Sequence, residues 1–325
     1  MAQSKSWQMN LPTALAIWAA IVALAAIGGL HLGYSSPAFA VALGVAAALF
    51  AFELILAAPN MLAAVQAALG RRGAVLAALV PLFAVLIYSF GVSGNWKYTL
   101  IGATYAVLPA LLLAASAGNS TASWLDYAAA AIIWLPVEFR WMYRIFPFPP
   151  QLSHTLTILL ALSAGVATFV LVRRLEGIGY AIEWKSGDGQ NVLLHFLLFV
   201  AIAVPLGISI HFIAYDFSMA RLRSLPMAAV GITFFTAWPE EFLFRGVLQN
   251  LFSKSLKNQW AGLAIASLIF GLSHILHAPF PNWKYVLLAT IAGLFYGHAW
   301  MKSGSLLPGA LVHAFVDISW HLLFR

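Results

Sequence analysis

The sequence predicts an all-α, multi-pass integral membrane protein, a bundle of about ten transmembrane helices. Hydrophobic residues make up 62% of the 325 residues and charged residues only 8%, whereas soluble domains carry about 25% charged residues. Such a chain has too few polar side chains to cover a surface that faces water. Apolar runs of roughly 20 residues, the length of a helix that crosses the hydrocarbon core, recur along the whole chain. Together these observations exclude a soluble globular protein.

Each predicted transmembrane helix corresponds to one apolar run. In chain order the runs lie at 12–30, 38–57, 74–93, 99–117, 152–173, 192–214, 226–251, 259–276, 284–301 and 305–324. The first run is too long for the apolar part of a signal peptide, and further spans follow at once, so we expect it to be a retained helix. A shorter run near 122–136 is either an eleventh span or a re-entrant segment, because about 15 residues fall short of a full crossing.

The longest polar stretch, residues 174–191, separates two regions of the chain. It ends in residues that form turns, Ser186-Gly187-Asp188-Gly189, as expected of a connection between structural units. We therefore divide the chain into an N-terminal membrane region at 1–190, of unassigned role, and a C-terminal region at 191–325.

The net charge of +7 comes from basic residues scattered singly or in pairs through the loops. This pattern favours anionic lipid head groups over nucleic acid as a partner. Lys5 and the Arg71-Arg72 pair fall on the same side of the predicted bundle, which predicts a cytoplasmic N-terminus, and we expect the plasma membrane as the location. Cysteine is absent, which leaves no thiolate nucleophile, disulfide or cysteine metal site.

Three ionisable residues interrupt the run at 226–251. Glu240, Glu241 and Arg245 lie among apolar residues, although each charge in hydrocarbon costs about 3 kcal/mol, so such residues are retained when they pair, face a polar cavity or act chemically. In a helix Glu241 and Arg245 share a face and can form an ion pair, while Glu240 points about 140° away from Arg245. A carboxylate left without that partner is suited to general base catalysis.

Two later runs add further polar groups. His274 lies in the run at 259–276, and His313 and Asp317 lie four residues apart in the last run. If these groups converge near the middle of the membrane, they can form hydrogen bonds with one another and with a shared water molecule. Each alone would be a buried polar group without a partner, which costs free energy. Gly293 and Gly297 have the spacing that lets the intervening helix pack closely against its neighbours.

The other histidines have a simpler interpretation. A single histidine within a membrane helix is usually a hydrogen-bonded packing residue. We assign that structural role to the histidines outside the cluster and its flanks, namely His154, His195, His211, His298 and His321.

Three short motifs connect these residues to a known family. They are Glu-Glu-xxx-Arg at 240–245, Phe-xxx-His at 270–274 and His-xxx-Asp at 313–317. In this order they resemble the motifs of the CAAX protease and bacteriocin-processing family of intramembrane proteases. The resemblance covers about residues 226–322, and it makes the region 191–325 the expected protease core.

The resemblance implies hydrolysis of a peptide bond within the membrane, near an embedded segment or the C-terminal tail of a protein or peptide substrate. Carried over by motif position, Glu240 and His274 would bind and activate the attacking water, and His313 with Asp317 would stabilise the oxyanion. Glu241 and Arg245 would hold the architecture of the site.

The role that the resemblance implies for Asp317 conflicts with the charge of a carboxylate. Members of the family carry Asn or Asp there, and an ionised Asp317 would repel an oxyanion. Asp317 must therefore be protonated, orient His313 or act in another way.

The resemblance favours a glutamate-type reaction without a metal or other cofactor. Histidine and glutamate are also zinc ligands, so a zinc-dependent protease stays open as the alternative. The chain lacks the His-Glu-xx-His helix that would make zinc compelling.

Two other classes of function compete with proteolysis. A proton-coupled transporter also uses acids and histidines within the membrane, but its polar residues would spread through both halves of the chain. A non-catalytic immunity protein that binds a peptide would not need the intact acid and both histidines. Concentration of these groups in 238–317 favours the protease.

Overall fold

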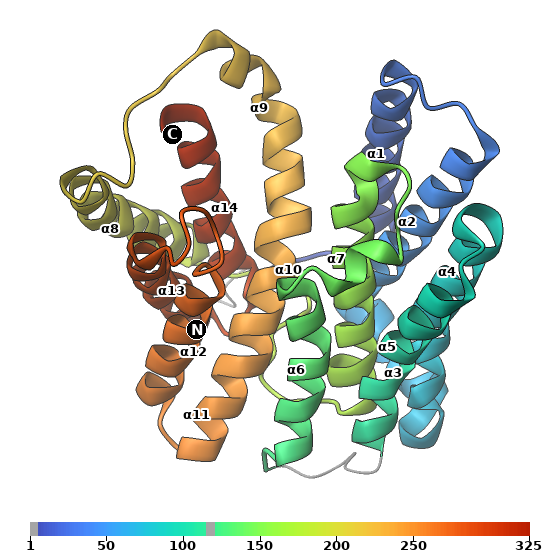
Figure 1. Ribbon diagram of the computed structural model, residues 1–325. Coiled ribbons are helices and arrows are strands. Elements are labelled where there is room, and N and C mark those ends of the chain that lie inside the picture. Colours follow the sequence, from blue (N-terminus) through green and yellow to red (C-terminus); the bar gives the residue numbers. More distant parts are fainter. Residues whose placement is uncertain (1–5, 115–120) are drawn as a thin grey trace. The chain divides into compact units, whose positions relative to one another are not determined.

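The computed structural model describes residues 6–114 and 121–325, which are helical almost throughout (Figure 1). Lys5, and residues 115–117 of the span expected at 99–117, lie outside the described residues. The described part divides into two compact units, Gln8–Glu176 and Gly177–Arg325, the second of which also includes residues 6–7. The division falls inside the polar stretch at 174–191.

The unit Gln8–Glu176 consists of α1 to α7. The helices span α1 Leu11–His31, α2 Pro37–Leu56, α3 Pro59–Gly73, α4 Leu79–Tyr88, α5 Trp96–Ala114, α6 Trp124–Glu138 and α7 Pro150–Gly165, with a π-helical continuation at Val166–Val172. Side-chain caps begin several of them, because the first backbone N–H groups of a helix have no partner within it. Asn10 accepts from Thr13 N and Ser36 accepts from Phe39 N.

Two pairs of buried polar side chains lie in this unit. Arg173 Nε lies 2.7 Å from Asp126 Oδ1, with both side chains at most 3% exposed. Ser163 donates to Glu53 over 2.8 Å. Pairing of this kind lets a charged or polar side chain occupy an apolar interior.

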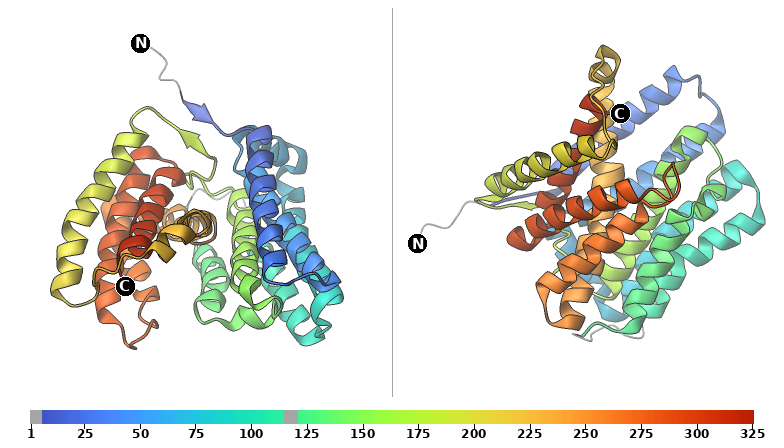
Figure 2. Two further views of the ribbon diagram at one scale, coloured as in Figure 1. Left: turned by 90° about the horizontal axis from the view of Figure 1, so that it is seen from above. Right: turned by 60° about the vertical axis from the view of Figure 1, so that its left-hand side comes forward.

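The unit from Gly177 to Arg325 consists of α8 to α14. The helices span α8 Asp188–Ser209, α9 Met219–Ile232, α10 Trp238–Glu241, α11 Asn250–Leu256, α12 Gln259–Ser273, α13 Trp283–Ser303 and α14 Leu306–Leu323. Helix α13 packs against α8, α12 and α14, and α14 also packs against α8 and α9 (Figure 2). The strands of the described residues, β1 Trp7–Gln8 and β2 Glu183–Trp184, have two residues each.

Seven helices among the described residues are long and apolar enough to cross a membrane. They correspond to seven of the runs expected from the sequence, and the fold class is confirmed. The other three runs are also helical, but α12 has 15 residues, the run at 226–251 is divided among α9, α10 and α11, and α13 carries more polar side chains. The run near 122–136 forms α6, which has 15 residues.

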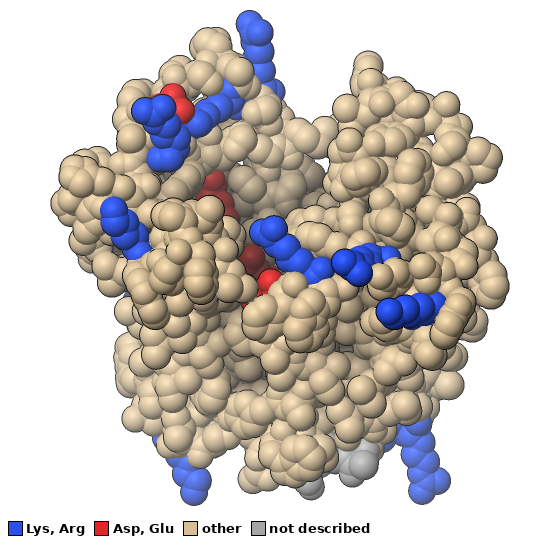
Figure 3. All heavy atoms as spheres, in the orientation of Figure 1, with Lys and Arg blue, Asp and Glu red and all other residues tan. Residues whose placement is uncertain are grey.

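The surface agrees with an integral membrane protein. Six large aliphatic side chains on α8 are 46–57% exposed, namely Leu193, Leu194, Leu197, Leu198, Ile202 and Ile208. The face of the molecule drawn in Figure 3 consists almost entirely of uncharged residues, with a few Lys and Arg atoms and fewer acidic ones. Lipid chains, rather than water, are the solvent that such a surface requires.

Glycines allow the close approach of α12 and α13 that their spacing predicted. A Cβ atom at Gly293 would lie 3.0 Å from both Cα and Cβ of Ser267 on α12, and one at Gly271 would lie 2.7 Å from the carbonyl oxygen of Val286. We expect Gly293→Ala to destabilise the protein by about 1–3 kcal/mol, because the two backbones must move apart. Thermal unfolding of the purified protein in detergent measures this effect.

Gly231→Ala is the matched control, since a Cβ atom at Gly231 in α9 would have no neighbour within 4 Å. Alanine there should leave stability unchanged or raise it by about 0.5–1 kcal/mol, because it is the better helix former. Equal melting temperatures for the two variants would contradict the close packing of α12 on α13.

Candidate active site

Helix α10 holds the two adjacent glutamates between two widened turns. Residues Thr233–Ala237 before it and Phe242–Gln249 after it are π-helical, although the sequence predicted regular α-helix. Pro239 gives one physical reason, because its ring lacks an N–H and would clash with the carbonyl four residues earlier in an α-helix. Single π turns recur at functional sites, where they re-aim side chains.

Glu241 and Arg245 form the expected ion pair. Arg245 Nε lies 3.0 Å from Glu241 Oε2, and both side chains are at most 1% exposed. The guanidinium carbon lies 4.6 Å from the ring centre of Phe270 and 5.6 Å from that of Tyr296. The charge of Arg245 is thus enclosed by one carboxylate and aromatic faces, an arrangement that favours a delocalised cation.

His313 lies at the centre of the acidic cluster. Its Nδ1 is 3.0 Å from Glu241 Oε1, and its Nε2 is 3.5 Å from Asp317 Oδ2 and 3.9 Å from Glu240 Oε2. A carboxylate at Nδ1 fixes the tautomer in which Nδ1 carries a proton. The Nε2 atom therefore faces both Glu240 and Asp317.

The two acids that face Nε2 differ from Glu241 in exposure. The side chains of Glu240 and Asp317 are 34% and 37% exposed, while that of His313 is 4% exposed. The ring of His313 stacks on Tyr296, with 4.5 Å between ring centres. A rigid, buried imidazole thus presents one nitrogen to two accessible carboxyl groups.

His274 lies at the edge of this cluster, directly after the last residue of α12. Its Nδ1 is 2.9 Å from the carbonyl oxygen of Phe270, which leaves Nε2 as the outward nitrogen. The Phe270 ring lies 4.9 Å from the ring of His274 and 5.7 Å from that of His313. His274 also interacts electrostatically with His313 and Asp317.

The six residues identified from the sequence all belong to one unit, and five of them are in close contact with one another. Glu240, Glu241, Arg245, His313 and Asp317 form a chain of close contacts. His274 joins this chain across Phe270 rather than through a hydrogen bond to Glu240 among the described residues. The joint action of Glu240 and His274 on one water molecule stays a prediction, and the close contacts between side chains are centred on His313.

Two tyrosines of α13 belong to the site and were missed from the sequence. Tyr296 lies under His313, and Tyr285 lies against His274 with 4.4 Å between ring centres. Tyr296 directly precedes Gly297 of the close-packing pattern, which was a signal that its ring would be buried. No comparable sequence signal marked Tyr285.

The histidines assigned to packing are hydrogen-bonded as expected in four cases. His154 pairs with Tyr143 over 2.8 Å, His195 with His298 over 2.9 Å, and His321 with Ser224 over 3.2 Å. These pairs satisfy ring nitrogens without any connection to the acidic cluster.

The arrangement of the cluster differs from that of a zinc site. Within the described ranges, no three His, Asp or Glu side chains are arranged to share a metal ion. Nδ1 of His313 is already bound to Glu241, so only its Nε2 remains as a ligand atom. The residues do not fit zinc in this arrangement, and we derive no step through a metal.

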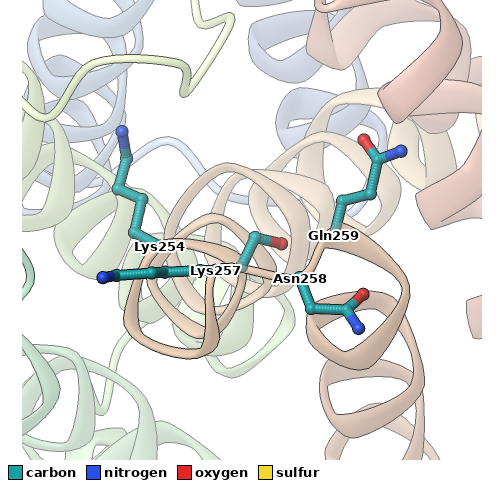
Figure 4. Close-up of a pocket in the computed structure, with 5 residues that line it drawn as sticks. Lys254, Lys257, Asn258 and Gln259 are labelled. Carbon is teal, nitrogen blue, oxygen red and sulfur yellow. The ribbon is translucent and has the colours of Figure 1, made fainter.

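A surface hollow elsewhere in the unit, at the turn between α11 and α12, involves none of these residues. It is lined by Ser253, Lys254, Lys257, Asn258 and Gln259, and the two lysines extend to the same side (Figure 4). None of the residues that line it is acidic or a histidine. The candidate active site is therefore the cluster formed by α10, α12, α13 and α14.

Comparison with known proteins agrees with the resemblance seen in the sequence. Residues 222–319 match the family model of the type II CAAX prenyl endopeptidase Rce1-like proteins. The matched segment runs from α9 to α14 and contains the whole acidic cluster. Neither a curated protein nor a solved structure matches the chain. The segment 222–319 of this integral membrane protein is thus similar to the Rce1-like family, which supports, at a general level, a CAAX-type intramembrane endopeptidase.

Proposed function

We propose that this protein hydrolyses a peptide bond of a protein or peptide substrate, near a membrane-embedded segment or the C-terminal tail, in the plasma membrane. The observation that carries the proposal is the convergence of Glu240 and Asp317 on Nε2 of His313, whose Nδ1 is held by Glu241. Four ionisable groups in close contact within an apolar bundle fit a catalytic site better than a packing role.

In the proposed reaction Glu240 is the general base. Its carboxylate accepts a proton from a water molecule that His274 helps to hold, and the resulting hydroxide attacks the carbonyl carbon of the substrate. The carbonyl π electrons move to oxygen and form an oxyanion. Collapse of the tetrahedral intermediate breaks the C–N bond, and the proton held by Glu240 passes to the leaving amine.

His313 is proposed to stabilise the oxyanion. Glu241 at Nδ1 favours the protonated ring, so Nε2–H can donate a hydrogen bond to the developing negative charge. Arg245 neutralises the other oxygen of Glu241 and holds it in place. Glu241 and Arg245 are thus positioning residues, whereas Glu240, His274 and His313 act on the water or the substrate.

Asp317 is proposed to act through its contact with His313 rather than as a charge on the substrate. We expect Asp317→Asn to keep activity within about tenfold of wild type, because an amide can hold His313 and also donate to an oxyanion. Asp317→Ala should lose about 10²-fold in kcat, since His313 is then unsupported at Nε2. Kinetics of both variants separate these outcomes, and an alanine variant as active as the asparagine variant would contradict the role.

The experiment that tests the function is a search for an uncut precursor. Membranes from cells with the wild-type protein are compared by quantitative proteomics with membranes from cells that carry Glu240→Gln. The expected result is at least one protein whose cleaved terminus disappears and whose longer form accumulates. Glu176→Gln, a change at an exposed glutamate, is the matched control, and identical termini in all three strains would overturn the proposal.

A further inference from the structure

Tyr285 lies in the first turn of α13, beside the accessible side of the acidic cluster. Its backbone N–H donates to the Asn282 side chain, which caps the helix over 3.0 Å. Its ring contacts His274, His277 and Phe212, with ring centres 4.4, 5.1 and 5.3 Å away. The backbone cap and these aromatic neighbours hold the phenol in one orientation.

The ring of Tyr285 lies between α12 and α14 beside the acidic cluster, because it contacts His274 and its centre is 6.2 Å from that of Trp320, three residues after Asp317. Tyr285 interacts electrostatically with Asp317 and Glu240, which come from α14 and α10. The interaction also extends to Tyr296, the residue stacked on His313. Because the ring packs against His274 of the cluster and against Trp320, one turn of α14 from Asp317, Tyr285 borders the proposed site.

The site has few groups that can donate a hydrogen bond to an oxyanion. Asp317 offers a carboxyl group where an amide would supply an N–H. Arg245 is enclosed against Phe270 and its side chain is 1% exposed, so it does not reach a substrate. Among the side chains described above, the Nε2 atoms of His313 and His274 and the Tyr285 hydroxyl remain as donors at the accessible side.

We propose that Tyr285 is a further catalytic residue, whose hydroxyl donates a hydrogen bond to the oxyanion formed during peptide hydrolysis. The inference rests on the proposed function. A neutral O–H suits this place because it supplies a donor without adding charge beside Arg245 and His313. Together with His313 it would give the oxyanion two donors, the number found in many acyl-transfer sites.

Tyr285→Phe tests the hydroxyl while it keeps the ring against His274, His277 and Phe212. The substrate for the assay is the precursor that accumulates with Glu240→Gln, and its conversion is followed with purified protein in detergent. We expect kcat to fall by about 10²–10³-fold with little change in KM, because the lost bond exists only in the transition state. Tyr215→Phe, at a tyrosine that is 70% exposed, is the control and should cleave at the wild-type rate.

Fluorinated tyrosines at position 285 separate a donor from a packing residue. They keep the ring and the hydroxyl, but the hydroxyl becomes progressively more acidic with added fluorine. If Tyr285 donates to the oxyanion, kcat changes steadily with phenol acidity across the series, while thermal unfolding stays the same. A kcat independent of acidity, or a Tyr285→Phe variant within about twofold of wild-type kcat, would overturn the inference.

The two proposals fail in different ways. If no precursor accumulates in membranes with Glu240→Gln, the proposed function fails, and the role of Tyr285 fails with it. Loss of cleavage in Glu240→Gln, combined with full activity in Tyr285→Phe, removes only the role of Tyr285.

Discussion

Glu240→Gln is expected to lower kcat by about 10²–10⁴-fold, the range that a general base contributes. The change keeps the size of the side chain and its hydrogen-bonding shape, but an amide cannot accept the proton of the attacking water. The side chain of Glu240 is 34% exposed, so the substitution does not leave an unpaired group in the core. We therefore expect the folded protein to form normally and only the chemical step to fail.

Single-turnover cleavage of the accumulated precursor measures this effect, and thermal unfolding in detergent checks the fold. Glu176→Gln is again the control, because it removes one exposed carboxylate elsewhere in the chain. If Glu240→Gln retained wild-type kcat while His274→Ala lost activity, the base would have to be sought elsewhere in the cluster. Wild-type kcat in both variants would remove the glutamate-type mechanism.

Glu241→Gln is expected to destabilise the protein by about 3–5 kcal/mol, the effect of opening a buried ion pair from one side. Arg245 would then keep its charge within the bundle, with aromatic rings but no carboxylate in contact. The double change Glu241→Gln with Arg245→Met removes both charges and should recover much of the loss. The midpoint of thermal unfolding in detergent, measured for the wild type, the single variant and the double variant, ranks their stabilities.

An exposed ion pair in the same unit supplies the comparison. Arg221 lies 2.8 Å from Asp216, with side chains 27% and 41% exposed. Asp216→Asn should therefore alter stability by less than about 1 kcal/mol. Similar losses for Glu241→Gln and Asp216→Asn would show that burial does not strengthen the pair between Glu241 and Arg245.

The site links stability and chemistry through one carboxylate. Glu241 contacts Arg245 with one oxygen and His313 with the other. The bond to Arg245 fixes the place of the carboxylate, and the bond to His313 fixes which nitrogen of the ring faces the substrate. Substitution of Glu241 should consequently reduce both the melting temperature and kcat, whereas substitution of Glu240 should reduce kcat alone.

Local patterns explain what could be predicted from the sequence. Hydrophobic runs identify membrane helices because backbone groups in hydrocarbon must bond within their own segment. The pairing of Glu241 with Arg245 followed from a separation of four residues, which survives the change from an α-turn to a π-turn. The close approach of α12 and α13 followed from Gly293, because a glycine on a helix face permits contact between backbones.

Only the tertiary structure showed that His313 lies at the centre of the acidic cluster. Glu241 and His313 are 72 residues apart, and no spacing rule indicates which of two histidines will bind which of two glutamates. The packing of α14 against α8, α9 and α13 sets that choice, as the rise of α13 brings Tyr285 to His274 and Tyr296 to His313. The sequence by itself determined a membrane helix bundle with an acidic, histidine-containing site, because composition and local spacing act within single helices. The hydrogen-bonded order of that site depends on contacts between helices, which only the packed structure specifies.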